Sequence, residues 1–206
     1  MKTNIFSLSS STHQKCVSQS VETLRSGGII IYPTDTIYGI GADATNDFAI
    51  EKIYHIKQRD SQKPLLILAS SLEMVKHYTK NISSTTEELL KKYWPGSVTF
   101  IFQANSLLPS SLTLNNTIGI RIPNNIFCLD VINELRKPII STSANISQQE
   151  GGTKIAEIQK DFFGKVNVII NAGDVENSLP STVVDVSGKI SKIVRQGVVE
   201  IKDDNL

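Results

Sequence analysis

Short polar side chains and cations recur in this sequence where an apolar, strand-like run ends. The first group, Thr34 to Thr36 with Tyr38, follows three isoleucines at 29–31. Later groups at strand ends are Arg121, the run Ser141-Thr142-Ser143 with Asn145, the pair Ser181 and Thr182, and Arg195. Any one of them is typical of an ordinary polar turn. Because ligands bind outside the strand ends of α/β sheets, their repetition predicts one polar pocket along a rim of the sheet.

Three more cations, Lys57, Arg59 and Lys63, lie close together after a predicted helix. A solvated basic turn is one interpretation of this cluster. The other is a clamp for a polyphosphate, with Arg59 binding through two hydrogen bonds and the lysines acting as mobile point charges. Arg121 is open to two interpretations as well. It is either a surface cation on a half-exposed strand or a fixed guanidinium that holds a carboxylate.

Several common kinds of site are absent from the sequence. It has no P-loop, no dinucleotide-binding glycine motif, no zinc-protease motif and no nucleophile elbow. His13, His55 and His77 have no partner ligands close in sequence, so no metal held by the protein is expected. The 21 basic and 20 acidic residues leave a net charge of +1, which argues against bulk electrostatic binding to nucleic acid or to an anionic membrane.

The sequence is that expected of a cytoplasmic protein. Residues 1–12 are polar and contain no apolar core of a signal peptide. No apolar run reaches the ~20 residues of a membrane span. Cys16 and Cys128 fall in helical patterns without metal-ligand spacing, as expected for small apolar packing residues in a reducing compartment.

Hydrophobic periodicity predicts the elements that position these groups. Helices are expected over 13–26 and 125–136, and from starts at Asn46 or Asp47, Ser70, Ser84 and Thr153. Strands are expected at 29–31, 64–69, 98–102, 117–122, 138–140, 166–170, 182–186 and 190–194. Gly39 and Gly41 are expected to let the backbone turn and approach another group closely. Some neighbouring strands are joined too tightly for parallel crossovers, so the prediction is a mixed sheet with helices packed on it, in a single domain over 1–206.

Seven short motifs, taken in order, resemble those of the YrdC-domain family, the threonylcarbamoyl-AMP synthases. They are PTDTIYGIG at 33–41, KQR and KPL within 57–65, WPGSVTF at 94–100, IGIRIP at 118–123, STSAN at 141–145, PSTVVD at 180–185 and VRQG at 194–197. The resemblance covers roughly residues 15–200. It implies an α/β fold of the α+β type, with a twisted mixed sheet, helices packed on it and a large concave, positively charged groove. The chain resembles the short members, which lack the C-terminal domain of the longer ones.

The resemblance also implies roles for individual residues. Lys57 and Arg59 would be catalytic, and both would meet the phosphates of ATP together with Lys63. Further ATP contacts would come from Thr117, Ser143, Asn145, Gly151 and Arg195. Threonine would be bound by Thr36, Leu68, Arg121, Ser141 and Ser181, with Arg121 on its carboxylate. Some family members have a histidine at the position of Leu68, so here only the backbone of this residue is available for a hydrogen bond.

The implied reaction joins ATP, L-threonine and bicarbonate to give threonylcarbamoyl-adenylate and pyrophosphate, with Mg2+ held mainly by the ATP phosphates. The product serves N6-threonylcarbamoylation of the tRNA adenosine next to the anticodon, which a separate transferase assembly carries out. A weak contact with tRNA or other RNA is a further expectation. Such a reaction needs positioning and charge stabilisation rather than a protein nucleophile, in agreement with the many hydroxyls and cations.

Two alternatives stay open at this point. One is an RNA-binding module that uses the groove to recognise shape and charge, against which the near-neutral net charge and the lack of clustered aromatics argue. The other is a carbamoyl-adenylate-forming relative, such as the related domain of hydrogenase-maturation carbamoyltransferases. Those proteins are larger and carry zinc-finger and acylphosphatase-like parts. Exchange of pyrophosphate into ATP that depends on threonine and bicarbonate would separate the enzyme from the RNA-binding module.

Overall fold

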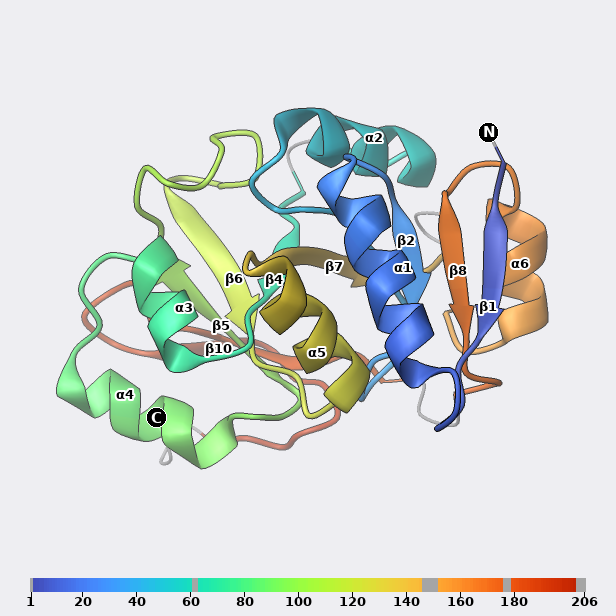
Figure 1. Cartoon of the computed structure of the whole chain (residues 1–206). Coiled ribbons are helices and arrows are strands. Elements are labelled where there is room, and N and C mark those ends of the chain that lie inside the picture. The colour runs from blue at the N-terminus through green and yellow to red at the C-terminus, as the bar shows by residue number, and fades with distance from the viewer. Residues whose placement is uncertain (1, 61–62, 146–151, 176–178, 203–206) are drawn as a thin grey trace.

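Apolar runs of the sequence form the centre of a mixed sheet in the computed structural model of the chain, which describes residues 2–60, 63–145, 152–175 and 179–202 (Figure 1). The strands of this part are β1 (Asn4–Ser7), β2 (Ile30–Tyr32), β3 (Gly39–Gly41), β4 (Leu66–Leu68), β5 (Val98–Gln103), β6 (Thr117–Arg121), β7 (Ile139–Ser143), β8 (Val168–Asn171), β9 (Thr182–Asp185) and β10 (Lys192–Arg195). Its helices are α1 (His13–Arg25), α2 (Asp47–Lys57), α3 (Leu72–Tyr78), α4 (Ser84–Tyr93), α5 (Ile126–Leu135) and α6 (Ile155–Phe162). Each predicted strand and helix is present, and β1 and β3 are additional.

The described strands lie in the order β1-β8-β2-β3-β7-β4-β6-β5-β9-β10. β8 is parallel to both β1 and β2, β4 is parallel to β6, and β5 is parallel to β9. The other neighbouring pairs are antiparallel, including the final pair of β9 and β10. The mixed sheet expected from the short connections is therefore confirmed.

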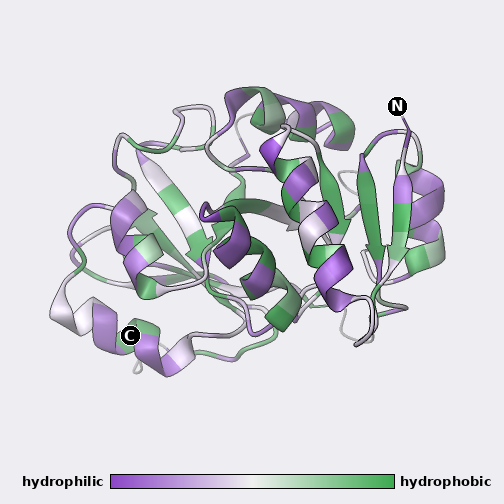
Figure 2. Ribbon diagram, viewed as in Figure 1, coloured by the Kyte–Doolittle hydropathy of each residue, from purple (hydrophilic) through white to green (hydrophobic). Residues whose placement is uncertain are grey.

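Apolar side chains cover both faces of the sheet. Ile30 and Tyr32 of β2 pack in one cluster with α1 and α5, whereas Ile29 and Ile31 pack in a second cluster on the other face. The second cluster takes residues from α2, α3, α4 and α6. A strand buried on both faces needs no polar alternation, which explains the unbroken isoleucines. Figure 1 shows α1 and α5 side by side across the sheet, and Figure 2 shows hydrophobic β2 and β8 beside helices that mix hydrophobic and hydrophilic residues.

Two helix starts differ by one residue from the prediction. Ser71 caps α3 and Ser83 caps α4, each by accepting a hydrogen bond from a backbone N–H three residues later. The expected caps were Ser70 and Ser84. The spacing to a glutamate three residues later selects Ser70 and Ser84, but the adjacent serine carries the same hydroxyl and caps the helix in each case. Asn46, one of the two predicted cap residues, caps α2.

The start of α6 is stabilised by a residue from a distant part of the chain. Thr153 was the predicted cap, but the helix begins two residues later, and Lys154 at the cap position makes no side-chain hydrogen bond. Instead, the carboxylate of Asp174 accepts a hydrogen bond from the Ile155 N–H at 3.0 Å. A carboxylate supplied from outside the helix satisfies the same unpaired N–H group that a local cap would.

The Gly-Ile-Gly segment forms β3 rather than the predicted turn. β3 pairs antiparallel with β2, where Gly39 faces Tyr32 and Gly41 faces Ile30. A Cβ atom on Gly41 would lie 2.6 Å from the Tyr32 ring, and one on Gly39 would lie 3.1 Å from it. The expectation that these glycines permit a close approach is confirmed, and the group that approaches is the Tyr32 ring.

Both cysteines are free and buried, Cys16 in α1 and Cys128 in α5. Their side chains fill the cluster beneath these helices, as predicted. Within the described ranges, none of the helices has the length and apolar character that crossing a membrane requires.

Candidate functional site

A cavity of about 440 Å³ opens on the face of the sheet that carries α1 and α5, beyond the area these helices cover. Leu66 of β4, Gly119 of β6 and Ser141 of β7 are paired neighbours that line it. On the same strands, Leu68 and Ile139 lie two residues further along and belong to the cluster with α1 and α5. Residues two apart on a strand point to the same face, so cavity and cluster share one side of the sheet.

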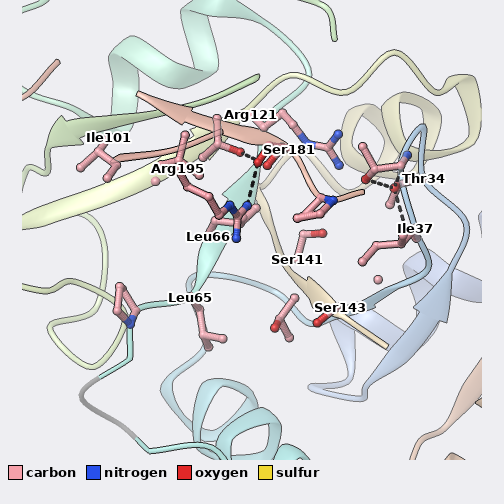
Figure 3. A pocket seen from close by; sticks show the side chains of 18 of the residues that line it. Thr34, Ile37, Leu65, Leu66, Ile101, Arg121, Ser141, Ser143, Ser181 and Arg195 are labelled. Carbon is pink, nitrogen blue, oxygen red and sulfur yellow. Dashed lines mark hydrogen bonds between the residues drawn. The ribbon is translucent and has the colours of Figure 1, made fainter. Parts of the chain in front are cut away.

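The hydroxyls and cations that follow separate strands in the sequence meet in this cavity (Figure 3). Its lining includes Thr36, Arg59, Lys63, Thr117, Arg121, Ser141, Ser143, Ser181 and Arg195. They come from the loop after β2, the segment before β4, and the ends of β6, β7, β9 and β10. The structure therefore gathers these predicted site residues at one concave, basic surface.

A second cavity of about 390 Å³ adjoins the first at its basic end. Arg59, Lys63 and Ser143 line both cavities. Lys57 and Asn145 line only the second. The two cavities are therefore adjacent, and Arg59, Lys63 and Ser143 face both of them.

Arg121 is buried at the cavity wall and held by one carboxylate. Its side chain is 4% exposed, and its Nη1 donates a hydrogen bond to Asp35 Oδ1 at 2.8 Å. The other oxygen of Asp35 accepts a hydrogen bond from Ser97 Oγ at 2.9 Å. Among the described residues, Arg121 Nε has no hydrogen-bond partner. Because a buried donor without a partner is costly, the guanidinium is suited to an acceptor brought by a ligand.

Paired hydroxyls line other parts of the cavity wall. Thr34 Oγ1 and Thr36 Oγ1 lie 3.0 Å apart, and Thr34 Oγ1 also donates to the Ile37 carbonyl. Thr99 Oγ1 and Ser181 Oγ lie 2.8 Å apart. All four hydroxyl side chains are almost fully buried. A hydroxyl both donates and accepts, so each pair can reorganise its protons to match a polar ligand.

Arg195 and Thr117 bound the cavity on the side of β5, β6 and β10. Arg195 Nη2 donates to the carbonyl of Ser181 at 2.8 Å, as Figure 3 shows. Thr117 Oγ1 donates to the carbonyl of Leu114 at 2.7 Å. Between them lie the apolar side chains of Ile101 and Val183. This part of the lining is a flat apolar surface with polar groups at its margin.

Lys57 is buried rather than mobile. Lys57 is the last residue of α2 and is 1% exposed. Its Nζ donates hydrogen bonds to the carbonyl of Ser143 and to both the carbonyl and Oδ1 of Asn145. Burial, with a smaller contribution from nearby Arg59, lowers the pKa of Lys57 to about 7. The interpretation of Lys57 as a mobile point charge is therefore wrong for the ligand-free chain: the amine ties α2 to the segment after β7.

Half-buried Arg59 and exposed Lys63 are cations that line both cavities. Arg59 Nη2 donates to the carbonyl of Pro64 at 3.0 Å, and Nε donates to the carbonyl of Lys63 at 3.3 Å. The guanidinium is thus folded against its own loop at the cavity mouth. Weak bonds to exposed carbonyls are readily exchanged for charge-assisted bonds to an anion.

One predicted site residue does not line the cavity, and another lies outside the described residues. The side chain of Leu68 is fully buried in the cluster with α1 and α5 and does not line the cavity. Gly151 lies outside the described residues. Asp35, by contrast, was named only as part of a polar loop, and its ion pair with Arg121 gives it a place at the site. The only sequence signal for this was its position in the PTDT motif.

The donor set of the cavities is cationic rather than metal-binding. No group of three His, Cys, Asp or Glu side chains that would hold a metal occurs in the part of the chain that the structure describes. Asp35 bonds Arg121 and Ser97, and Asp60 lines the second cavity among basic neighbours. Such a lining suits a polyanion that carries its own metal ion more than a metal bound by the protein alone.

The Sua5/YciO/YrdC family profile, described as "Telomere recombination", matches residues 22–197. The chain belongs to this family. The threonylcarbamoyl-AMP synthase of Pyrococcus abyssi is 31% identical over 181 residues, which are 87% of this chain and 53% of the relative. A putative threonylcarbamoyl-AMP synthase of Methanocaldococcus jannaschii is 33% identical over 199 residues, 96% of this chain and 93% of the relative.

Solved Sua5/YciO/YrdC structures share the fold. Pyrococcus abyssi Sua5 complexed with L-threonine matches with a TM-score of 0.88 at 29% identity, over 96% of this chain and 58% of that chain. Escherichia coli YciO matches with a TM-score of 0.88 at 28% identity, over 98% of this chain and 99% of that chain. The predicted family and fold are confirmed. The chain spans about half the length of the Pyrococcus relative it matches.

Proposed function

We propose that this chain is an L-threonylcarbamoyladenylate synthase, which makes threonylcarbamoyl-AMP and pyrophosphate from L-threonine, bicarbonate and ATP. The names of its relatives support this activity, and the related Sua5 was solved with L-threonine bound. The product would feed tRNA N6-threonylcarbamoyladenosine synthesis through a separate transferase assembly. The two free cysteines agree with action in the reducing cytoplasm.

The observation that carries the proposal is the buried Arg121 guanidinium at the wall of a cavity with cations at its mouth. A fixed guanidinium recognises a carboxylate through two parallel hydrogen bonds. The α-carboxylate of threonine would occupy this place. The threonine side chain would lie among the hydroxyls of Thr36, Ser141 and Ser181, which line the same cavity.

ATP would extend from the apolar margin of the cavity to its basic mouth. The nucleoside would contact Thr117, Ser143 and Arg195, and the phosphates would reach Arg59 and Lys63. Lys57 and Asn145 would line the phosphate region in the second cavity, where Lys57 Nζ donates hydrogen bonds to Asn145 and holds it in place. The combined volumes of the two cavities leave room for an amino acid beside a nucleotide.

The chemistry requires orientation and charge stabilisation. The threonine amine attacks the carbon of bicarbonate, and loss of water leaves a carbamate. A carbamate oxygen then attacks the α-phosphorus of ATP, the bond from that phosphorus to the bridging oxygen breaks, and pyrophosphate leaves. Arg59 and Lys63 would stabilise the charge that develops on the leaving phosphates. Holding both reactants in line supplies much of the remaining acceleration.

Mg2+ would enter with ATP, bound mainly by phosphate oxygens. It would neutralise charge on the leaving pyrophosphate. The cationic lining of the two cavities suits such an ion, because the phosphates supply its oxygen ligands and the protein supplies the surrounding positive charge.

The test is to incubate the protein with ATP, Mg2+, L-threonine and bicarbonate, and to detect threonylcarbamoyl-adenylate by mass. Omitting threonine or bicarbonate should abolish the product, as well as the exchange of pyrophosphate into ATP. Arg59→Ala should reduce turnover about ten- to hundredfold, the effect of losing charge-assisted hydrogen bonds. Lys80→Ala, at an exposed lysine that does not line either cavity, is the matched control. Wild-type protein that makes no adenylate under these conditions would refute the proposal.

A further inference from the structure

Asp35 bonds Arg121 through one guanidinium nitrogen, and Ser97 in turn bonds Asp35. Asp35 Oδ1 accepts a hydrogen bond from Arg121 Nη1 at 2.8 Å, and Asp35 Oδ2 accepts one from the Ser97 hydroxyl at 2.9 Å. The Asp35 side chain is 10% exposed, so this ion pair is largely desolvated. Both carboxylate oxygens have defined donors, which fixes the plane of the carboxylate.

Ser97 is itself fixed by the backbone around it. Its carbonyl accepts a hydrogen bond from the N–H of Thr182 at the start of β9. The neighbouring Gly96 N–H donates to the carbonyl of Ile122, one residue beyond Arg121. The segment that carries Ser97 is therefore tied to β9 and to the end of β6. Through Ser97, Asp35 is held in a constant position relative to the strand that carries Arg121.

The atom that Asp35 binds decides which edge of Arg121 remains for a ligand. A guanidinium offers two parallel donors along its Nε–Nη2 edge, and Nη1 points to the opposite side. Asp35 occupies Nη1, while Nε has no partner among the described residues. Nε, the donor without a partner, lies on the edge that binds a carboxylate side-on through two hydrogen bonds.

We propose that Asp35 is a positioning residue, which together with Ser97 holds Arg121 by Nη1 so that its Nε–Nη2 edge meets the α-carboxylate of the amino-acid substrate. The inference rests on the proposed function and goes beyond it by assigning a role to Asp35 and Ser97. The Asp35 charge also offsets that of Arg121, so recognition depends on the two directed hydrogen bonds rather than on net charge. Substrates without a carboxylate are then excluded by geometry.

The test compares steady-state kinetics of wild type, Asp35→Ala, Asp35→Asn and Ser97→Ala, with threonine and threonine amide as substrates. Asp35→Ala should raise the KM for threonine by about tenfold or more, the effect of misplacing charge-assisted hydrogen bonds. The KM for ATP should stay unchanged, and kcat should fall much less than KM rises. Discrimination against threonine amide should shrink by a similar factor, because an unfixed guanidinium no longer selects the carboxylate.

The conservative variant separates positioning from charge. In Asp35→Asn, the amide oxygen can still accept a hydrogen bond from Arg121, while the amide nitrogen donates one to the Ser97 hydroxyl. The KM for threonine should therefore lie close to the wild-type value and well below that of Asp35→Ala. Ser97→Ala should raise the KM for threonine about threefold, since one hydrogen bond from a neutral donor is removed. Asp130→Asn is the matched control, because that carboxylate pairs with His13 between α1 and α5, away from the cavity.

Several outcomes would overturn the inference. These are an unchanged threonine KM and amide discrimination in Asp35→Ala, a fall in kcat alone, and an Asp35→Asn variant no better than the alanine variant. A parallel rise in the KM of ATP would mark Asp35 as merely structural. If Asp35→Ala does not fold, an unchanged threonine KM in Ser97→Ala overturns the inference. Wild-type protein without threonine-dependent product would instead refute the proposed function.

Discussion

One face of the sheet has two halves built from different kinds of residue, although the same strands run through both. In the half under α1 and α5, the covered half, Leu68 and Ile139 are fully buried and pack with Phe127 of α5. In the other half, the cavity half, β4 and β7 present Leu66 and Ser141 to open space. These positions are only two residues from their buried counterparts.

The comparison teaches that the site exists where helix cover ends. In the covered half, large apolar side chains exclude water and stabilise the fold through the area they bury. In the cavity half, small or polar residues such as Gly119, Thr99 and Ser141 leave room for a ligand. Stability and binding are therefore assigned to different stretches of the same strands, and substitutions should separate them.

The largest expected difference is between Leu68→Ala and Leu66→Ala, on one face of one strand. Leu68→Ala should lower the free energy of unfolding by about 2–5 kcal/mol, since it leaves a cavity in the core. Leu66→Ala should cost less than about 1.5 kcal/mol, because that side chain is only partly buried. Urea unfolding of the wild type and both variants measures the two losses in the free energy of unfolding. Equal losses would show that the two halves are not energetically distinct.

Arg121→Lys tests the cavity half through binding rather than stability. An ammonium cannot supply two parallel donors, so kcat/KM for threonine should fall roughly ten- to hundredfold. Wild-type protein should also use threonine amide poorly. Arg25→Lys is the control, because Arg25 bonds a carbonyl of α5 on the exposed side of the covered half. Equal use of threonine and its amide by the wild type would contradict the assignment of Arg121.

A smaller effect is expected from the hydroxyls of the cavity half. The wild type should prefer threonine to serine by about 1–3 kcal/mol, the value of one methyl group in an apolar pocket, and should reject valine more strongly. Thr36→Val should narrow the gap between threonine and valine more than the gap between threonine and serine. Specificity constants for the three amino acids measure this. If the wild type uses valine as well as serine, Thr36 does not recognise the hydroxyl.

Proton linkage gives an effect spread over several pH units, and it arises from Lys57, which lines the second cavity. Burial lowers its pKa from the ordinary 10.5 to about 7, so between these values the unfolded chain binds one more proton than the folded chain. The free energy of unfolding should therefore rise with pH in that window, by up to about 1.4 kcal/mol per pH unit. Lys57→Met should lack this rise. Parallel stability profiles for the two proteins would show that Lys57 keeps its proton in the fold.

The sequence predicted most elements because both faces of the strands are apolar and most helices have a capping signal. β1 escaped prediction because three of its four residues are exposed, which leaves no apolar pattern. β3 escaped because Gly-Ile-Gly has low intrinsic strand preference, and its pairing depends on the ring of Tyr32 lying across it. Tertiary contacts, rather than local preference, form both strands.

The sequence predicted which residue types form the site, but it did not predict which of them pair with one another. Hydroxyls and cations could be found because most of them lie next to an apolar run. The pairing of Asp35 with Arg121 spans 86 residues and depends on the strand order, which no local pattern encodes. Leu68 lies on the correct face of β4, but the sequence does not show that helix cover begins between Leu66 and Leu68.

The strand order also sets the sequence in which the sheet can assemble during synthesis. β1 pairs with β8, and the adjoining hydrogen bond from Thr3 to Val166 spans 163 residues. At ribosomal rates, β8 emerges roughly 8–30 s after β1, so β1 stays unpaired with its neighbour among the described strands throughout that interval. One edge of β2 cannot pair until β8 has been made, whereas its other edge pairs with β3, which follows soon after it in the chain. The connection between β2 and β3 is the loop that carries Asp35, which leaves the ribosome before its two hydrogen-bond partners, Ser97 and Arg121.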